Sequence, residues 1–147
     1  MSKRIRSILA AIALFSAAAA FPAAGGEAAV VDGDLVIPKK DLSKVARFYP
    51  VVIEGYRMEI IAVTAPDRTN RVVFNACQAC GPVGYSQRGD SVVCKACGNA
   101  FKLSVLERER GGCNPIPVGE KNRRDDGANI VIGREFLKLA KDYFSKL

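Results

Sequence analysis

The side chains best suited to chemistry in this chain of 147 residues are its five cysteines, which all lie between Cys77 and Cys113. They form two Cys-x-x-Cys pairs, Cys77 with Cys80 and Cys94 with Cys97, each followed at once by glycine. Two cysteines three residues apart can turn both sulfurs to one ion when the backbone makes a tight turn. The spacing therefore predicts that these four cysteines bind one metal ion in a tetrahedral site of four sulfurs.

The residue types narrow the choice of metal without deciding it. Tetrahedral thiolate sites suit Zn(II) and iron-sulfur centres, and soft thiolates also bind Cu(I). The chain has no histidine, which excludes histidine-ligated zinc, blue copper and c-type haem attachment. The alternative to a metal is a framework of disulfides, because residues 1–24 read as a leader that would export the chain to an oxidising compartment. The odd number of cysteines disfavours this alternative.

Cys113 is the thiol that four-coordinate chemistry leaves over. A free cysteine in an exported protein can oxidise or pair between molecules, so its presence calls for a role. Gly111 and Gly112 before it permit backbone geometries that other residues avoid, and Pro115 and Pro117 stiffen the chain after it. We expect Cys113 to lie beside the two pairs, either as a fifth, exchangeable thiolate or as the ligand of a second metal. The alternative is a buried apolar cysteine.

The motifs around these cysteines resemble the FtrD-like membrane iron-sulfur family, and the resemblance extends from about Val36 to Phe144. The matching segments share cysteines, glycines and aromatic residues in the same order: Phe74 to Cys80, Gly84-Tyr85, Gly89-Asp90, Val93 to Phe101 and Gly111 to Pro117. The resemblance implies an iron-sulfur cluster or iron as the cofactor, with zinc as the alternative. It also implies electron transfer or metal handling linked to bacterial iron uptake. Because this chain lacks the membrane spans that precede the cysteine domain of larger members, a membrane iron permease or redox partner would be met in trans.

The first 24 residues have the pattern of a secretory signal peptide. Lys3, Arg4 and Arg6 precede an uncharged apolar run from Ser7 to Phe21, and small residues follow. A transmembrane helix needs about 20 apolar residues, so the shorter run leaves an uncleaved anchor as the alternative. We expect residues 1–24 to be the signal peptide, 25–33 a linker and 34–147 a single cysteine-rich metal-binding domain. That domain would be periplasmic or lie on the outer face of the cytoplasmic membrane.

Charge and residue types disfavour nucleic-acid binding and enzymatic activity. The formal net charge of +7 includes three charges of the leader, and the basic stretch from Glu107 to Asp126 alternates in sign like a solvated loop. No histidine is available as a general base, and no small-molecule substrate is inferred. We expect an exported metal-binding protein; the alternatives are a structural zinc-ribbon interaction domain and a thiol-disulfide redox protein. Glycine after each cysteine pair, where thioredoxin-like sites begin a helix, disfavours the last of these.

The hydrophobic pattern predicts an α+β fold: a small antiparallel sheet, two short helices and a double Cys-x-x-Cys knuckle of the zinc-ribbon or rubredoxin kind. Leu42, Val45, Phe48 and Tyr49 have helical spacing, and we expect this first helix to end at Pro50. Short apolar runs bounded by turn residues predict the strands, which are 35–37, 51–53, 58–63 and 71–74. The last of these strands leads directly into the first cysteine pair, so the sheet is expected to position it.

The chain also contains a weak internal repeat. Residues 34–49 align without gaps on residues 129–144, at a constant offset of 95. Each copy reads as a strand followed by an amphipathic helix, which predicts two matching units that close over one core with the termini meeting. Any strand-helix pair can look alike, which is the alternative explanation of the repeat.

Overall fold

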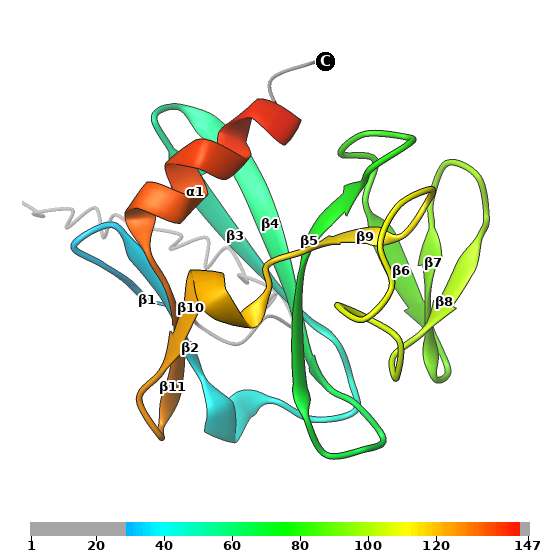
Figure 1. Cartoon of the computed structure of the whole chain (residues 1–147), viewed down its shortest axis with the longest axis horizontal. Helices are drawn as coiled ribbons and strands as arrows, with labels where there is room; N and C mark the ends of the chain where they lie inside the picture. The colour runs from blue at the N-terminus through cyan, green and yellow to red at the C-terminus, as the bar shows by residue number, and fades with distance from the viewer. Residues whose placement is uncertain (1–28, 145–147) are drawn as a thin grey trace, which may run out of the picture.

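Residues 29–144, the part of the chain that the computed structural model describes, form three antiparallel sheets and one short α-helix (Figure 1). The structure is thus mostly β, with less helix than the α+β expectation. The expected signal peptide, residues 1–24, lies outside the described residues. Ala29–Val31, which is part of the expected linker of residues 25–33, forms the strand β1. Within residues 29–144, no helix is long and apolar enough to cross a membrane.

The middle sheet carries the first cysteine pair. Its strands run in the order β3 (Arg47–Ile53), β4 (Tyr56–Thr64), β5 (Asn70–Cys77) and β9 (Pro115–Pro117). β4 and β5 are buried on both faces, because successive side chains of a strand point to opposite sides and each side meets its own apolar cluster. Phe74 packs in one cluster with the first sheet and the helix, whereas Val73 and Cys77 pack in the other.

The first sheet, which covers one face of the middle sheet, is built from the two ends of the described chain. Its order is β1 (Ala29–Val31), β2 (Asp34–Pro38), β11 (Asn129–Ile132) and β10 (Arg123–Asp125), with the 3-10 turn η2 (Glu120–Asn122) before β10. β2 pairs with β11 antiparallel, and Val36 lies opposite Val131. The expected meeting of the two repeat units is therefore present in the strands.

The repeat extends to whole hairpins. Val30 pairs with Leu35 in the first hairpin, and the residues 95 positions later, Asp125 and Ile130, pair in the second. In the β2–β11 ladder, Ile37 pairs with Ile130, and their equivalents in the other copy, Ile132 and Leu35, also pair with each other. This sheet therefore has an approximate two-fold axis through its centre. The two copies differ after the sheet, where only the second continues into an α-helix.

The predicted first helix is wrong. Lys39–Asp41 form a single 3-10 turn, η1, and the chain then enters β3, in which Tyr49, Val51 and Ile53 are buried and Pro50 and Val52 are exposed. Pro50 does not end a helix but lies within β3, which among the strands of residues 29–144 pairs only with β4 and is thus an edge strand. An edge strand accepts proline, because its outward N–H group needs no partner in the sheet.

The second predicted helix is present. α1 (Arg134–Ala140) continues into the 3-10 turn η3 (Lys141–Tyr143), and Leu137 and Ala140 are buried against the first core cluster. Phe136 and Phe144 pack on Phe74 of β5, with ring centroids 6.0 and 5.6 Å away. The helix therefore stabilises the strand that ends in Cys77.

The third sheet carries the second cysteine pair and covers the other face of the middle sheet (Figure 1). It consists of β6 (Tyr85–Arg88), β7 (Ser91–Cys94) and β8 (Ala100–Lys102) in that order. Tyr85, Val92 and Cys94 are buried against Val73 of the middle sheet. The two cysteine pairs therefore approach each other across the interface of two sheets.

Candidate metal centre

Each cysteine pair begins at the last residue of a strand and continues as a tight turn. In the first turn, Cys77 and Gly81 exchange backbone hydrogen bonds of 2.8 Å, and in the second the Gly98 N–H donates to the Cys94 carbonyl at 3.0 Å. Gly81 and Gly98 have φ values of +80° and +75°, a region that costs glycine nothing and other residues considerably. The strand fixes the first cysteine of each pair, and the glycine lets the chain close behind the second.

The five sulfurs converge in two overlapping groups of three. Cys77, Cys80 and Cys94 form the first group, and Cys80, Cys97 and Cys113 form the second, with all Sγ atoms of a group within 4.8 Å of one another. Cys80 belongs to both groups. Cys113 Sγ lies 3.4 Å from Cys97 Sγ and 4.0 Å from Cys80 Sγ.

The four cysteines predicted to bind one metal do not all fall in one group, because Cys77, Cys80 and Cys94 lie together and Cys97 belongs to the other group. The sulfur of Cys97 does not lie within 4.8 Å of both the Cys77 and the Cys94 sulfur; it lies 3.4 Å from that of Cys113. Cys113 lies beside the two pairs, as the sequence led us to expect, but metal binding by any of the five stays a prediction. The wider likeness to a zinc ribbon or rubredoxin is not confirmed.

The two groups differ in their exposure to solvent. Cys77 and Cys94 are each only 1% exposed and belong to the apolar cluster between the middle and third sheets. Cys80 and Cys113 are half-buried, and Cys97 is exposed. One end of the cysteine cluster is therefore held in the core, while the other end faces water.

The donor set and the spacing fit a metal bound by thiolates. With metal–sulfur bonds of about 2.3 Å, two sulfurs at the corners of a tetrahedron lie about 3.8 Å apart. The sulfur–sulfur distances of 3.4 and 4.0 Å at Cys113 lie on either side of this value. Five sulfurs, with no histidine in the chain, make a soft site that suits iron, zinc or Cu(I) and disfavours Mg²⁺ or Ca²⁺.

Hydrogen bonds in the two turns set the acidity of the thiols. Burial raises the pKa of Cys77, but hydrogen bonds to its sulfur, foremost one of 3.1 Å from the Cys80 N–H, outweigh burial and lower it. The Asn99 N–H lowers the pKa of Cys97 to about 7. The pKa values of Cys80 and Cys113 are raised, chiefly by the hydrogen bond between Cys80 and Cys77 and by that between Cys113 and Cys97. Since the thiolate is the form that binds metals, the lowered pKa of one cysteine in each pair favours metal binding there.

Asn75 and Tyr85 connect the cysteine turns to the middle sheet. The buried side chain of Asn75 donates to the Glu59 carboxylate and accepts the Tyr85 N–H at 2.6 Å. The Tyr85 hydroxyl then donates to the carbonyl of Cys113. Gly84 is needed for the close approach, because a Cβ there would lie 3.1 Å from the Asn75 amide nitrogen and its φ is +81°.

Sequence reasoning missed this role of Asn75 and Tyr85. The two residues lie inside segments that resembled the family, Phe74 to Cys80 and Gly84-Tyr85. Nothing in their spacing indicates that they contact each other, because the contact depends on β5 and β6 lying in different sheets. The available signal was their position directly beside cysteine motifs.

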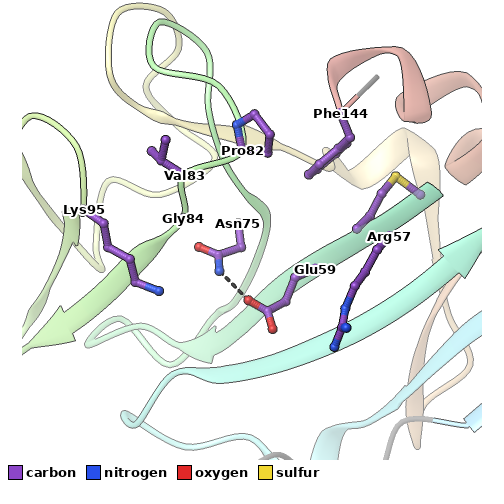
Figure 2. A pocket seen from close by; sticks show the side chains of 9 residues that line it. Arg57, Glu59, Asn75, Pro82, Val83, Gly84, Lys95 and Phe144 are labelled. Carbon is purple, nitrogen blue, oxygen red and sulfur yellow. Dashed lines mark hydrogen bonds between the residues drawn. The ribbon is translucent and has the colours of Figure 1, made fainter. Parts of the chain in front are cut away.

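Two pockets flank the cysteine turns. One has a volume of about 250 Å³. Figure 2 shows its side chains, among which Asn75 is hydrogen-bonded to Glu59. Its lining residues are Arg57, Met58, Glu59, Asn75, Pro82, Val83, Gly84, Lys95 and Phe144. The other, of about 440 Å³, is lined by residues 77–81 together with Ile116, Asp142 and Tyr143. The second pocket gives solvent access to the first turn.

We predict that Tyr85→Phe loosens the segment that carries Cys113. Loss of one hydroxyl–carbonyl hydrogen bond should cost about 1 kcal/mol of unfolding free energy, while the ring keeps its packing. In metal-free protein, Cys113 should then react faster with a maleimide, measured by mass spectrometry of timed samples. Tyr56→Phe on the exposed surface of β4 is the control. An unchanged Cys113 rate in Tyr85→Phe would contradict the prediction.

Comparison with known proteins identifies a family whose model matches most of the chain. A family model described as "Membrane iron-sulfur containing protein FtrD-like" matches residues 42–144. The match includes all five cysteines and the three segments that bring them together. No curated protein and no solved structure matches significantly.

Proposed function

The chain belongs to the FtrD-like family of membrane iron-sulfur containing proteins, and on this basis we propose that its cysteine cluster binds iron as part of an iron-uptake system. The observation that carries the proposal is the convergence of five sulfurs from three separate segments into two groups that share Cys80. Five neighbouring thiols without a bound metal are prone to oxidation, and binding of a metal to their sulfurs protects them.

The proposed ligands follow from the burial of the sulfurs. Cys77, Cys80 and Cys94 form the group that is held most firmly, because two of them lie in the apolar core at the ends of strands. The fourth sulfur of a tetrahedral site would come from Cys97 or Cys113. When bound, iron would supply one-electron chemistry; zinc in the same site would make the cluster a structural element.

The exposed end of the cluster suits exchange with a partner. Cys97 is exposed and Cys113 is half-buried, so an electron or a metal ion would pass through this end and not through the core. We propose electron transfer or metal handling as the role, with a membrane permease or a redox protein as the partner in trans. The five-thiol cluster would then lie outside the membrane, in the periplasm or on the outer face of the cytoplasmic membrane.

The composition of the purified protein tests the proposal. We expect protein purified anaerobically from its own host to contain at least one iron per chain, and about two or four irons with inorganic sulfide if the centre is an iron-sulfur cluster. Its visible absorption should include sulfur-to-iron charge-transfer bands that disappear when a chelator removes the metal. A colourless protein with one zinc would favour the structural zinc alternative. A metal-free protein with no more than one free thiol per chain would contradict metal binding and favour the disulfide framework, because five cysteines can form at most two disulfides within a chain.

A further inference from the structure

Cys97 and Cys113 are close neighbours in the cluster, with their Sγ atoms 3.4 Å apart. They come from different segments, the turn after β7 and the loop before β9. They also lie at the solvent end of the cluster, since Cys97 is exposed and Cys113 half-buried. A dissolved reagent or a partner protein would therefore reach these two sulfurs before Cys77 or Cys94.

The backbone beside both cysteines has room to move. Gly98 follows Cys97, and Gly111 and Gly112 precede Cys113; at each of these glycines a Cβ would meet nothing within 4 Å. A disulfide has an S–S bond of about 2.05 Å, so the sulfurs must approach by little more than 1 Å. Segments that are flanked by glycine in open space can make such a shift without breaking core packing.

We propose that Cys97 and Cys113 form a reversible disulfide by thiol-disulfide exchange, and that this bond and a metal on the outer group of Cys80, Cys97 and Cys113 exclude each other. The disulfide itself does not depend on the proposed function, but its exclusion of metal does. The bond would consume two of the three sulfurs of the outer group. The inner group of Cys77, Cys80 and Cys94 would keep its thiols.

The reaction partner is a small-molecule or protein disulfide, R–S–S–R. The Cys97 thiolate attacks one sulfur of it, forming a mixed disulfide and releasing R–S⁻. Cys113 then gives its proton to solvent and attacks the Cys97 sulfur, which releases the second R–S⁻. In total, two cysteine thiols and one R–S–S–R become one Cys97–Cys113 disulfide and two R–SH, and two electrons pass from the protein to the reagent.

Peptide mapping of the full chain tests the disulfide. Metal-free, reduced protein is incubated with oxidised glutathione, alkylated and digested with trypsin. Cleavage after Lys95 places Cys94 and Cys97 on different peptides, and Cys113 lies on a third, between Arg110 and Lys121. We expect one linked pair, the peptides of Cys97 and Cys113, with the other three cysteines alkylated. A main product that joins Cys80 to Cys113 or Cys94 to Cys97, or five alkylated thiols, would overturn the proposal.

Single substitutions show whether the disulfide joins Cys97 to Cys113 or involves the neighbouring Cys80. Cys97→Ser and Cys113→Ser should each abolish the intramolecular bond. Cys80→Ser is the matched control, because Cys80 Sγ is the next sulfur from Cys113 at 4.0 Å, and this variant should keep the Cys97–Cys113 link. A link that disappears in Cys80→Ser would show that Cys80 takes part in it, and the proposed pairing would be wrong.

Co(II), used as a coloured probe of thiolate sites, tests the exclusion. Reduced protein loaded with Co(II) should keep all five thiols during the same incubation with oxidised glutathione, and reduction of the oxidised protein should restore Co(II) absorption. Equal disulfide formation with and without bound Co(II) would overturn the exclusion. Reduced protein that binds no Co(II) at all would instead contradict the proposed metal centre, while the disulfide would be judged by the peptide map.

Discussion

Serine in place of Cys80 is expected to abolish metal binding and to lower the melting temperature more than any other single substitution of a cysteine. Cys80 is the sulfur that both groups share, so its loss leaves two sulfurs in each. A metal bound by thiolates supplies folding free energy, about 10–16 kcal/mol for structural zinc in small domains. Metal content per chain and thermal unfolding, measured on the same preparations, check this expectation.

The controls for Cys80→Ser are Cys97→Ser and Cys113→Ser. Each removes a sulfur from the outer group only and leaves Cys77, Cys80 and Cys94 together. These variants should keep part of the metal, or bind it with a changed spectrum, and they should stay folded. If Cys80→Ser retained the metal content and melting temperature of the unchanged protein, Cys80 would not be a ligand and the shared position of its sulfur would have no role.

Arg123→Met should cost about 3–5 kcal/mol of unfolding free energy, because it leaves the Glu107 carboxylate buried without its cation. The two side chains are 12% and 8% exposed, and Arg123 Nη1 lies 2.7 Å from Glu107 Oε1. Glu107 also accepts the Gly119 N–H at 3.2 Å, and Arg123 donates to the Asn70 carbonyl at 3.3 Å. This ion pair holds the loop before Cys113 to β10 of the first sheet. Urea unfolding of metal-free and metal-loaded protein measures the loss.

A double variant shows whether the uncompensated charge causes the loss. Glu107→Gln removes the carboxylate charge but keeps an oxygen for Gly119, so combining it with Arg123→Met should recover most of the stability. Lys39→Met is the matched control, since it breaks the exposed pair of Lys39 and Asp125 at the same sheet and should change stability far less. An Arg123→Met effect no larger than that of Lys39→Met would disprove the argument.

The strands could be predicted from the sequence because each has a simple local pattern. The runs 51–53, 58–63 and 71–74 lie within β3, β4 and β5, and the repeat at an offset of 95 correctly matched β2 with β11. The first helix failed for a physical reason: Val45 is exposed, while Phe48 and Tyr49 belong to an edge strand that tolerates Pro50. Whether a strand lies at an edge depends on tertiary pairing, which local spacing does not contain.

The cysteine site could be predicted in its composition but not in its grouping. The two Cys-x-x-Cys pairs with their glycines indicated the turns, and the prolines after Cys113, together with Gly111-Gly112 before it, suggested a defined position for this thiol. The division into an inner group and an outer group depends on how β5 and β7 approach across two sheets. The connection from Asn75 through Tyr85 to Cys113 depends on the same approach.

The pairing of β2 with β11 has a consequence for the order in which the protein folds. Ile37 and Ile130 are partners in this ladder although almost the whole domain separates them in the chain. Contacts between distant residues form slowly, because the intervening chain must first lose its freedom. The sulfur cluster also joins separate segments, but its cysteines are at most 36 positions apart, from Cys77 to Cys113, whereas Ile37 and Ile130 are 93 positions apart. We therefore expect the sulfur cluster to assemble early during refolding, and closure of the two terminal hairpins to be the slow step.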